Sequence, residues 1–112
     1  DRALISLQED GSIELPSMPK HCQHNAHMYY LKLKNLAQRT AFIDFLKDKG
    51  VSAVFHYIPL HSAPAGKKFG VFHGDDIFTT IESERLVRLP LYFNMTQNER
   101  AAVVDAVLEF FA

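Results

Sequence analysis

The feature that most constrains the fold is a change of hydrophobic period within residues 28–58. From Met28 to Lys34 apolar and polar side chains alternate, with Tyr29, Leu31 and Leu33 on one face. A period of two residues predicts a strand that is buried on one side. The alternation then gives way to a helical period, so this part of the chain predicts a strand followed by a helix.

The helix is predicted from Gln38 to Lys49. Its apolar stripe consists of Phe42, Phe45 and Leu46, which recur at helical spacing. Gly50 follows directly, and glycine is the residue that most readily takes the left-handed conformation at a helix C-terminus. These signals together predict both the existence and the end of the helix.

A second strand is predicted from Val51 to Ile58, where side chains alternate between two faces. Pro59 ends it, because proline has no backbone donor for the ladder. Pro59 to Asp76 is then expected to form a long loop with three glycines. Loops of this length are uncommon in compact domains and often functional.

Two capping boxes predict helix starts in the rest of the chain, at Thr79-x-x-Glu82 and Thr96-x-x-Glu99. The first predicts a short helix that Pro90 stops, and the second predicts a terminal helix with a valine-rich apolar stripe. The elements before the first strand are weaker. We expect a mildly helical stretch, a short extended piece and a linker-like loop in the ranges Asp1–Glu9, Ser12–Leu15 and Pro16–Asn25.

The predicted fold is an α/β (α+β) two-layer sandwich, a small sheet covered on one face by helices. Residues 1–112 fit a single domain. A net charge of −1 gives no field for phosphate backbones, so nucleic-acid binding is disfavoured, and no apolar stretch approaches a membrane span. The single Cys22 suits a reducing compartment, so we expect a cytoplasmic location. A start at Asp1 rather than methionine favours a piece of a larger protein.

The densest polar cluster runs from His21 to His27 and includes Cys22. Imidazole and thiolate are zinc ligands, which makes a small metal-binding domain one hypothesis. The spacing is poor for a structural zinc site, and no second ligand pair stands at a recognised distance. A solvated loop that leads into a strand is favoured, and no metal site is predicted.

A second cluster, from His56 to Pro64, lies where a strand ends and the long loop begins. Binding residues concentrate at strand ends in α/β folds. From the pattern alone, a core tyrosine at Tyr57 and two surface histidines, His56 and His61, are at least as good an interpretation as a site. Lys68 lies in a Gly-Lys-Lys-Phe-Gly segment that could meet a phosphate, although it is not a P-loop.

The chain resembles the C-terminal third of the DegT/StrS family of sugar aminotransferases, which use pyridoxal phosphate, from about Gly11 to Ala112. The motifs that carry the resemblance are Asn25 and His27 before a strand, Arg39 near a helix start, Leu46 to Val51, the signature His56-Tyr57-x-Pro59-Leu60-His61, and Ser83-Glu84 to Leu89-Pro90. Three stretches are most similar to the branch that aminates dTDP-4-oxo-6-deoxy-D-glucose: His56 to Gly74, Thr79-Thr80, and Glu82 to Leu86.

The resemblance implies the small C-terminal domain of a fold-type I aminotransferase that moves an amino group from glutamate to the 4-keto group of a nucleotide sugar. It implies a homodimer, a large pyridoxal-phosphate-binding domain in the same polypeptide, and a Schiff-base lysine outside this chain. The chain alone is therefore expected to be inactive, with no catalytic residue of its own. His56, Tyr57, His61 and Lys68 are the expected substrate-binding residues. The alternative is a freestanding ligand-binding or regulatory α/β module without catalysis.

Overall fold

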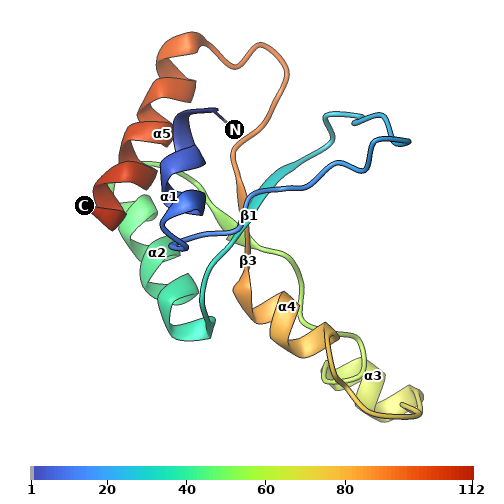
Figure 1. Cartoon of the computed structure of the whole chain (residues 1–112). Helices are drawn as coiled ribbons and strands as arrows, with labels where there is room; N and C mark the ends of the chain where they lie inside the picture. The colour runs from blue at the N-terminus through green and yellow to red at the C-terminus, as the bar shows by residue number, and fades with distance from the viewer. Residues whose placement is uncertain (1) are drawn as a thin grey trace.

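The computed structural model of the chain describes residues 2–112 and shows a small α+β fold with a three-stranded antiparallel sheet and five α-helices. The strands are β1 (Tyr29–Lys32), β2 (Val54–Phe55) and β3 (Leu86–Leu89), in the spatial order β1-β3-β2. Figure 1 shows α1 (Ile5–Glu9), α2 (Leu36–Asp48) and α5 (Gln97–Phe111) on one side of the sheet, while α3 (Pro64–Phe69) and α4 (Thr79–Arg85) extend away from it. The molecule thus has two parts. We call the sheet with α1, α2 and α5 the packed half, and the other part projects from it.

The two long helices begin and end where the sequence signals predict. α2 (Leu36–Asp48) begins at Asn35, whose side chain accepts a hydrogen bond from the Gln38 amide, and Gly50 follows it at φ +75°. α5 (Gln97–Phe111) begins at Thr96 with both hydrogen bonds of the capping box in place. Both predicted helices are confirmed within a few residues at their ends.

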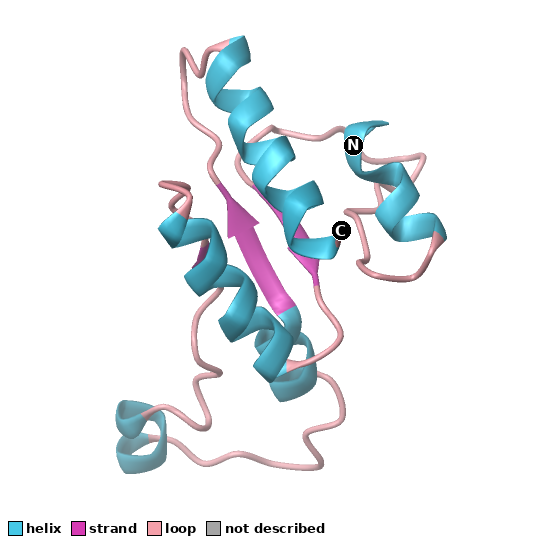
Figure 2. Ribbon diagram, turned by 90° about the vertical axis from the view of Figure 1, so that its left-hand side faces the viewer, coloured by secondary structure: helices cyan, strands magenta, loops and turns pink. Residues whose placement is uncertain are grey.

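The core lies between these helices and the sheet. Figure 2 shows α2 and α5 lying across one face of the strands. The Phe42 ring of α2 is fully buried and meets the Phe110 ring of α5 edge-on, with centroids 5.0 Å apart. Leu31 of β1 and Val87 of β3 are also fully buried and are register partners in the ladder. The apolar stripes of strand and helix therefore meet in one core.

The N-terminal segment is helical, as the sequence predicts, and it closes one end of this core. A 3₁₀ turn (Arg2–Leu4) leads into α1 (Ile5–Glu9), and Leu4 and Leu7 are buried. The predicted extended piece forms one antiparallel bridge, between Glu14 and Lys32. The expected linker that follows is irregular and exposed.

The central strand β3 differs from the sequence prediction, in which the short helix continues toward Pro90. The helix α4 (Thr79–Arg85) ends earlier, and Leu86–Leu89 forms the strand between β1 and β2. Val87 and Leu89 are buried while their neighbours are half-buried, which is a period of two. Four residues are too few for a helical and an alternating pattern to be told apart. Pro90 thus ends a strand, not a helix.

The predicted second strand is much shorter than Val51–Ile58. Only Val54 and Phe55 pair with β3, opposite Arg88 and Val87. Tyr57 has φ +56°, a left-handed conformation that turns the chain out of an extended ladder. The paired part of Val51–Ile58 is therefore only two residues long.

The predicted long loop contains a helix, α3 (Pro64–Phe69), so the loop prediction is wrong in part. The Thr79–Glu82 capping box is also absent. Phe78 occupies the N-cap position without a side-chain hydrogen bond, and the Asp76 carboxylate accepts from the Thr80 amide instead (3.2 Å). A residue three positions before the helix thus accepts from an amide of its first turn, whereas the Glu82 amide bonds to the Phe78 carbonyl.

We call residues 57–78 the arm. It projects from the sheet, with α3 near its tip (Figure 1). α3 has no buried residue. The apolar side chains exposed along the arm are Tyr57, Ile58, Leu60, Phe69, Val71, Phe72, Ile77 and Phe78. An arm this rich in apolar residues has no core of its own within the described chain.

A group of ions ties the base of α4 to the first strand. The Lys32 ammonium lies 2.5 Å from one Glu82 carboxylate oxygen, and the Arg85 guanidinium pairs with Glu82 and Glu14. Arg85 Nε also donates to the Leu33 carbonyl (2.7 Å). These contacts fix where α4, and with it the end of the arm, leaves the sheet.

Candidate functional site

The candidate site begins where β2 ends. Tyr57 is 67% exposed, and its ring lies under the Arg88 guanidinium, 5.6 Å from the ring centroid. The role of Tyr57 as a site residue stays a prediction. The alternative interpretation of Tyr57 as a core tyrosine is wrong, because the side chain is exposed. Its left-handed φ and its exposure go together, because the chain turns outward at this residue.

His56 is held differently from Tyr57. Its ring lies 4.9 Å from the Tyr57 ring, and the side chain is half-buried. Its Nδ1 atom is buried and has no hydrogen-bond partner among residues 2–112. A buried ring nitrogen without a partner is costly, so a group from outside the described chain is the natural partner for it.

A first hollow, of about 340 Å³, lies beside Tyr57 between α2, α4 and the chain after β2. Arg39 of α2 is its only basic residue. The guanidinium lies 5.0 Å from the Phe55 ring centroid, and one terminal nitrogen donates to the Ser83 carbonyl (2.9 Å). Burial lowers the pKa of Arg39, against a raising effect of Glu84.

Arg39 was singled out by the sequence only as a motif position, not as a site residue. Its Nε is buried and has no hydrogen-bond partner within residues 2–112. The signal that points to it is a basic residue in the first turn of a helix, a place that cations normally avoid because of the helix dipole. That signal is visible in the sequence once the start of α2 is known.

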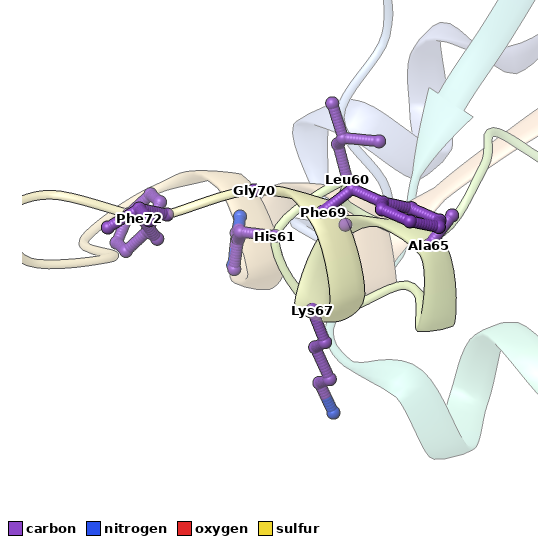
Figure 3. A pocket seen from close by; sticks show the side chains of 9 residues that line it. Leu60, His61, Ala65, Lys67, Phe69, Gly70 and Phe72 are labelled. Atoms are coloured by element: carbon purple, nitrogen blue, oxygen red, sulfur yellow. The ribbon is translucent and has the colours of Figure 1, made fainter.

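A second hollow, of about 720 Å³, is open to the surface of the arm. Figure 3 shows its lining, which includes His61, Lys67 of α3 and Phe72. The His61 and Phe72 rings lie with centroids 4.4 Å apart and planes tilted by 33°. The site residue predicted at His61 thus belongs to this hollow, while Tyr57 belongs to the first.

His61 is joined to two residues that the sequence analysis did not select. Its Nε2 lies 2.8 Å from Asp76 Oδ2 and 3.5 Å from Thr80 Oγ1. The Thr80 hydroxyl donates to the same Asp76 oxygen, and the Thr80 amide donates to the other. The Thr80 hydroxyl above all, and then its amide and His61, hold the pKa of Asp76 below its ordinary value. Asp76 is accordingly a carboxylate at neutral pH.

Lys68 lies on α3 but does not line the second hollow. Its ammonium is 5.0 Å from the centroid of the neighbouring Phe69 ring, whereas Lys67 is among the lining residues. The two lysines are adjacent on a helix, so they point in directions about 100° apart. A phosphate in the second hollow would meet Lys67 more directly than Lys68.

The His21–His27 cluster lies on an exposed loop. The His24 Nδ1 accepts a hydrogen bond from the Ala26 amide (2.7 Å), and the Asn25 side chain accepts from the His27 amide (3.1 Å). Cys22 is an exposed free thiol. Over residues 2–112, no three His, Cys, Asp or Glu side chains gather closely enough to hold a metal ion. Two polar side chains of this loop thus bond to its own backbone.

The described helices include none with the length and apolarity that crossing a membrane requires. Of the four predicted site residues, Tyr57 lines the first hollow and His61 lines the second, while His56 and Lys68 line neither. His61 with Asp76 and Thr80, and Arg39 beside Tyr57, are the two polar groupings that the structure assembles.

Two sequence comparisons bear on this chain. The model of the DegT/DnrJ/EryC1/StrS aminotransferase family matches residues 1–108. The uncharacterised protein MJ1066 of Methanocaldococcus jannaschii is 36% identical over 96 residues, which are 82% of this chain and 25% of that protein. The chain thus spans about a quarter of the length of the curated relative it matches.

Solved structures with the same fold cover almost the whole chain. The aminotransferase TlmJ from Streptoalloteichus hindustanus aligns with a TM-score of 0.81 at 22% identity, over 98% of this chain and 29% of that one. DesV from S. venezuelae, in complex with a ketimine intermediate, gives 0.82 at 21%, over 97% and 29%. NtdA from Bacillus subtilis, with bound cofactor PMP, gives 0.72 at 23%, over 97% and 25%. At these identities the likeness is one of fold.

Proposed function

Because this chain belongs to the DegT/DnrJ/EryC1/StrS aminotransferase family, we propose that it is the C-terminal small domain of a larger, pyridoxal-phosphate-dependent sugar aminotransferase. The observation that carries the proposal is the match of the family model to residues 1–108, nearly the whole chain. The chain would form one two-layer domain, and the large cofactor-binding domain would lie elsewhere in the same polypeptide. Such an enzyme would work in the cytoplasm.

The lysines of this chain do not fit the cofactor. A Schiff-base lysine needs a desolvated amine with a lowered pKa. Lys32 is half-buried, but the hydrogen bond from its ammonium to Glu82 raises its pKa, which is the opposite direction. The other lysines are all exposed: Lys20, Lys34, Lys47, Lys49, Lys67 and Lys68. We therefore place the cofactor lysine outside this chain and expect the chain alone to be inactive.

The role proposed for this chain is to supply one wall of the sugar-nucleotide pocket. His56, Tyr57, His61 and Lys68 are its proposed substrate-binding residues. Two observations support this: the exposed Tyr57 with its left-handed backbone, and the unpartnered Nδ1 of His56. Both leave polar atoms for a group that the described chain does not contain.

The proposed reaction moves an amino group from glutamate to the 4-keto group of dTDP-4-oxo-6-deoxy-D-glucose, a substrate of enterobacterial common antigen synthesis. We propose a homodimer as the working form. The apolar side chains along the arm support a partner surface, since exposed apolar patches of this kind mark interaction sites. The large domain of the same polypeptide is the first such partner.

The experiment that tests the function uses the protein expressed from the complete reading frame. We expect a yellow absorption band that bleaches when glutamate is added and returns when dTDP-4-oxo-6-deoxy-D-glucose follows. A colourless protein would overturn the enzyme and leave the freestanding ligand-binding module. A band that bleaches with glutamate but does not return with this sugar would keep the aminotransferase and overturn the substrate.

The pocket wall is tested by substitution in the same protein. Tyr57→Phe and His61→Ala are expected to raise the KM for the sugar nucleotide while glutamate still bleaches the band. His73→Ala is the matched control, because His73 is an exposed histidine of the same arm that lines neither hollow. Unchanged KM in both variants would overturn the proposed wall.

A further inference from the structure

The cluster of His61, Asp76 and Thr80 goes beyond the residues proposed above, because it fixes which nitrogen of His61 is free. We propose that Asp76 is a positioning residue that, with Thr80, holds His61 as the Nε2–H tautomer and so presents Nδ1 as a hydrogen-bond acceptor for a hydroxyl of the nucleotide-linked sugar. This inference rests on the proposed function. It adds to it a residue, a tautomer and a class of ligand group.

The tautomer follows from what surrounds Nε2. Asp76 Oδ2 lies 2.8 Å from it, and an ionised carboxylate can only accept a hydrogen bond. Thr80 Oγ1 lies 3.5 Å from the same nitrogen but has given its own hydrogen to Asp76 Oδ2. Its oxygen can therefore only accept as well. Since both neighbours are acceptors, Nε2 must carry the hydrogen.

The carboxylate itself is held from two sides. The Thr80 amide donates to Asp76 Oδ1 (3.2 Å), and the Thr80 hydroxyl donates to Oδ2. Thr80 lies in the first turn of α4, whose other end is fixed to β1 through Glu82 and Arg85. The orientation of Asp76, and so of His61, is thus set by a helix that is anchored in the packed half. The arm thus has one anchored polar group, His61 with Asp76, among its exposed apolar side chains.

The His61 ring is held on one face and at one nitrogen. Phe72 covers one face of the imidazole at a centroid distance of 4.4 Å, which limits its tilt. His61 lines the second hollow, and within residues 2–112 its hydrogen bonds all involve Nε2. The side chains of His61 and Asp76 are 19% and 22% exposed, so their bond is partly shielded from competing water. In a neutral imidazole with hydrogen on Nε2, Nδ1 carries the lone pair and accepts.

An acceptor at Nδ1 selects a donor. A sugar hydroxyl can donate to it, whereas a diphosphate oxygen cannot. A site that hydrogen-bonds a substrate hydroxyl discriminates strongly against analogues without it, because its own polar group is then left unpaired. The preference for a hydroxyl group of the ligand thus follows from the tautomer of His61. The presence of a histidine alone would not give it.

The test uses the full-length enzyme, with glutamate bleaching of the cofactor band as the first readout and the KM for dTDP-4-oxo-6-deoxy-D-glucose as the second. Asp76→Asn, which allows either tautomer, is expected to raise KM about tenfold, the effect of about one hydrogen bond, with kcat and bleaching unchanged. Thr80→Val is expected to raise it about threefold. Asp75→Asn is the matched control, since the Asp75 side chain makes no hydrogen bond within the described residues.

A double substitution separates positioning from a direct contact. If Asp76 acts only through His61, then His61→Ala with Asp76→Asn has the same KM as His61→Ala alone. An additive loss would overturn the positioning role. So would an unchanged KM in Asp76→Asn when His61→Ala raises it.

The tautomer is read independently of activity, by the ¹⁵N shifts of histidine-labelled full-length protein, with His61 assigned by its loss in His61→Ala. We expect the unprotonated nitrogen to be Nδ1 in the native protein and in Asp75→Asn, and to become mixed in Asp76→Asn. A native Nδ1–H tautomer overturns the inference even where glutamate bleaches the band. A colourless protein with the expected shifts overturns the proposed function while the positioning of His61 by Asp76 stands.

Discussion

The packed half and the arm contain similar apolar side chains but use them in opposite ways. Phe42 of α2 is 0% exposed and lies among the aromatic rings of α5, whereas Phe69 of α3 is 80% exposed. α2 and α5 have thirteen and fifteen residues and bury stripes against a sheet, while α3 has six residues and buries none. A short helix without a neighbouring layer has nothing to bury its apolar face against.

The two parts are also held together by different interactions. The packed half is held by burial, which scales with apolar area removed from water. The arm is held at its base by the Asp76–Thr80 hydrogen bonds and the ion group of α4. The apolar side chains of the arm are left exposed.

The largest expected effect contrasts the two phenylalanines. Phe42→Ala should lower the free energy of unfolding of the chain by about 3–5 kcal/mol, since it leaves a cavity beneath α5. Phe69→Ala should change it by less than about 0.5 kcal/mol, because its ring is already in solvent. Urea unfolding followed by circular dichroism measures both. Equal losses would show that the arm is packed as firmly as the core.

A second contrast concerns two glycines. Gly50→Ala places an L-residue at φ +75° after α2, with an expected cost of about 1–2 kcal/mol in global stability. In Gly66→Ala the new Cβ would stand 1.6 Å from the Leu60 carbonyl oxygen, so the backbone of the arm must move.

Despite this clash, Gly66→Ala should act locally. Hydrogen exchange should speed up at the Lys67 and Gly70 amides of α3, which bond to Ala63 and Gly66, while the urea midpoint stays near that of the parent chain. A fall in the urea midpoint as large as that of Gly50→Ala would show that the arm contributes to the global stability of the chain.

The capping box of α5 tests the edge of the packed half. Thr96→Ala removes the acceptor for the Glu99 amide and should cost about 1 kcal/mol of stability. Thr79→Ala is the control at the same motif in α4, where no capping bond forms, and should cost little. Thermal unfolding of both variants gives the answer, and a larger loss for Thr79→Ala would contradict the structure.

The smallest expected effect concerns the ions at the base of the arm. The hydrogen bond from Lys32 lowers the pKa of Glu82, so this pair stabilises the fold at neutral pH and is lost as the pH falls through the lowered pKa. Because Glu82 is 37% exposed, solvent screening limits the contribution to less than about 1 kcal/mol. Glu82→Gln should remove that part of the acid dependence between pH 5 and 3, about the range where a glutamate titrates. An unchanged loss of stability between about pH 5 and 3 in Glu82→Gln would show that the Lys32–Glu82 pair contributes nothing.

Much of the packed half could be predicted from local signals, and most of the arm could not. α2, α5 and β1 each carry a clear period, and α2 and α5 also carry a cap or a glycine stop. The six-residue α3 and the left-handed Tyr57 carry no comparable signal. The resemblance selected His61 as a site residue, but its partner Asp76 stands fifteen residues away across the arm. Only the folded arm brings the two side chains together.

By itself, the sequence determined which segments are amphipathic, where the long helices start and stop, and the family to which the chain belongs. These depend on neighbours within a turn or two, which a pattern of residues records directly. The tertiary structure alone decided that Leu86–Leu89 is the central strand and that Thr80 and Asp76 hold His61. Strand pairing and side-chain networks join residues far apart in the chain, and their free energy is realised only when the whole fold brings those residues into contact.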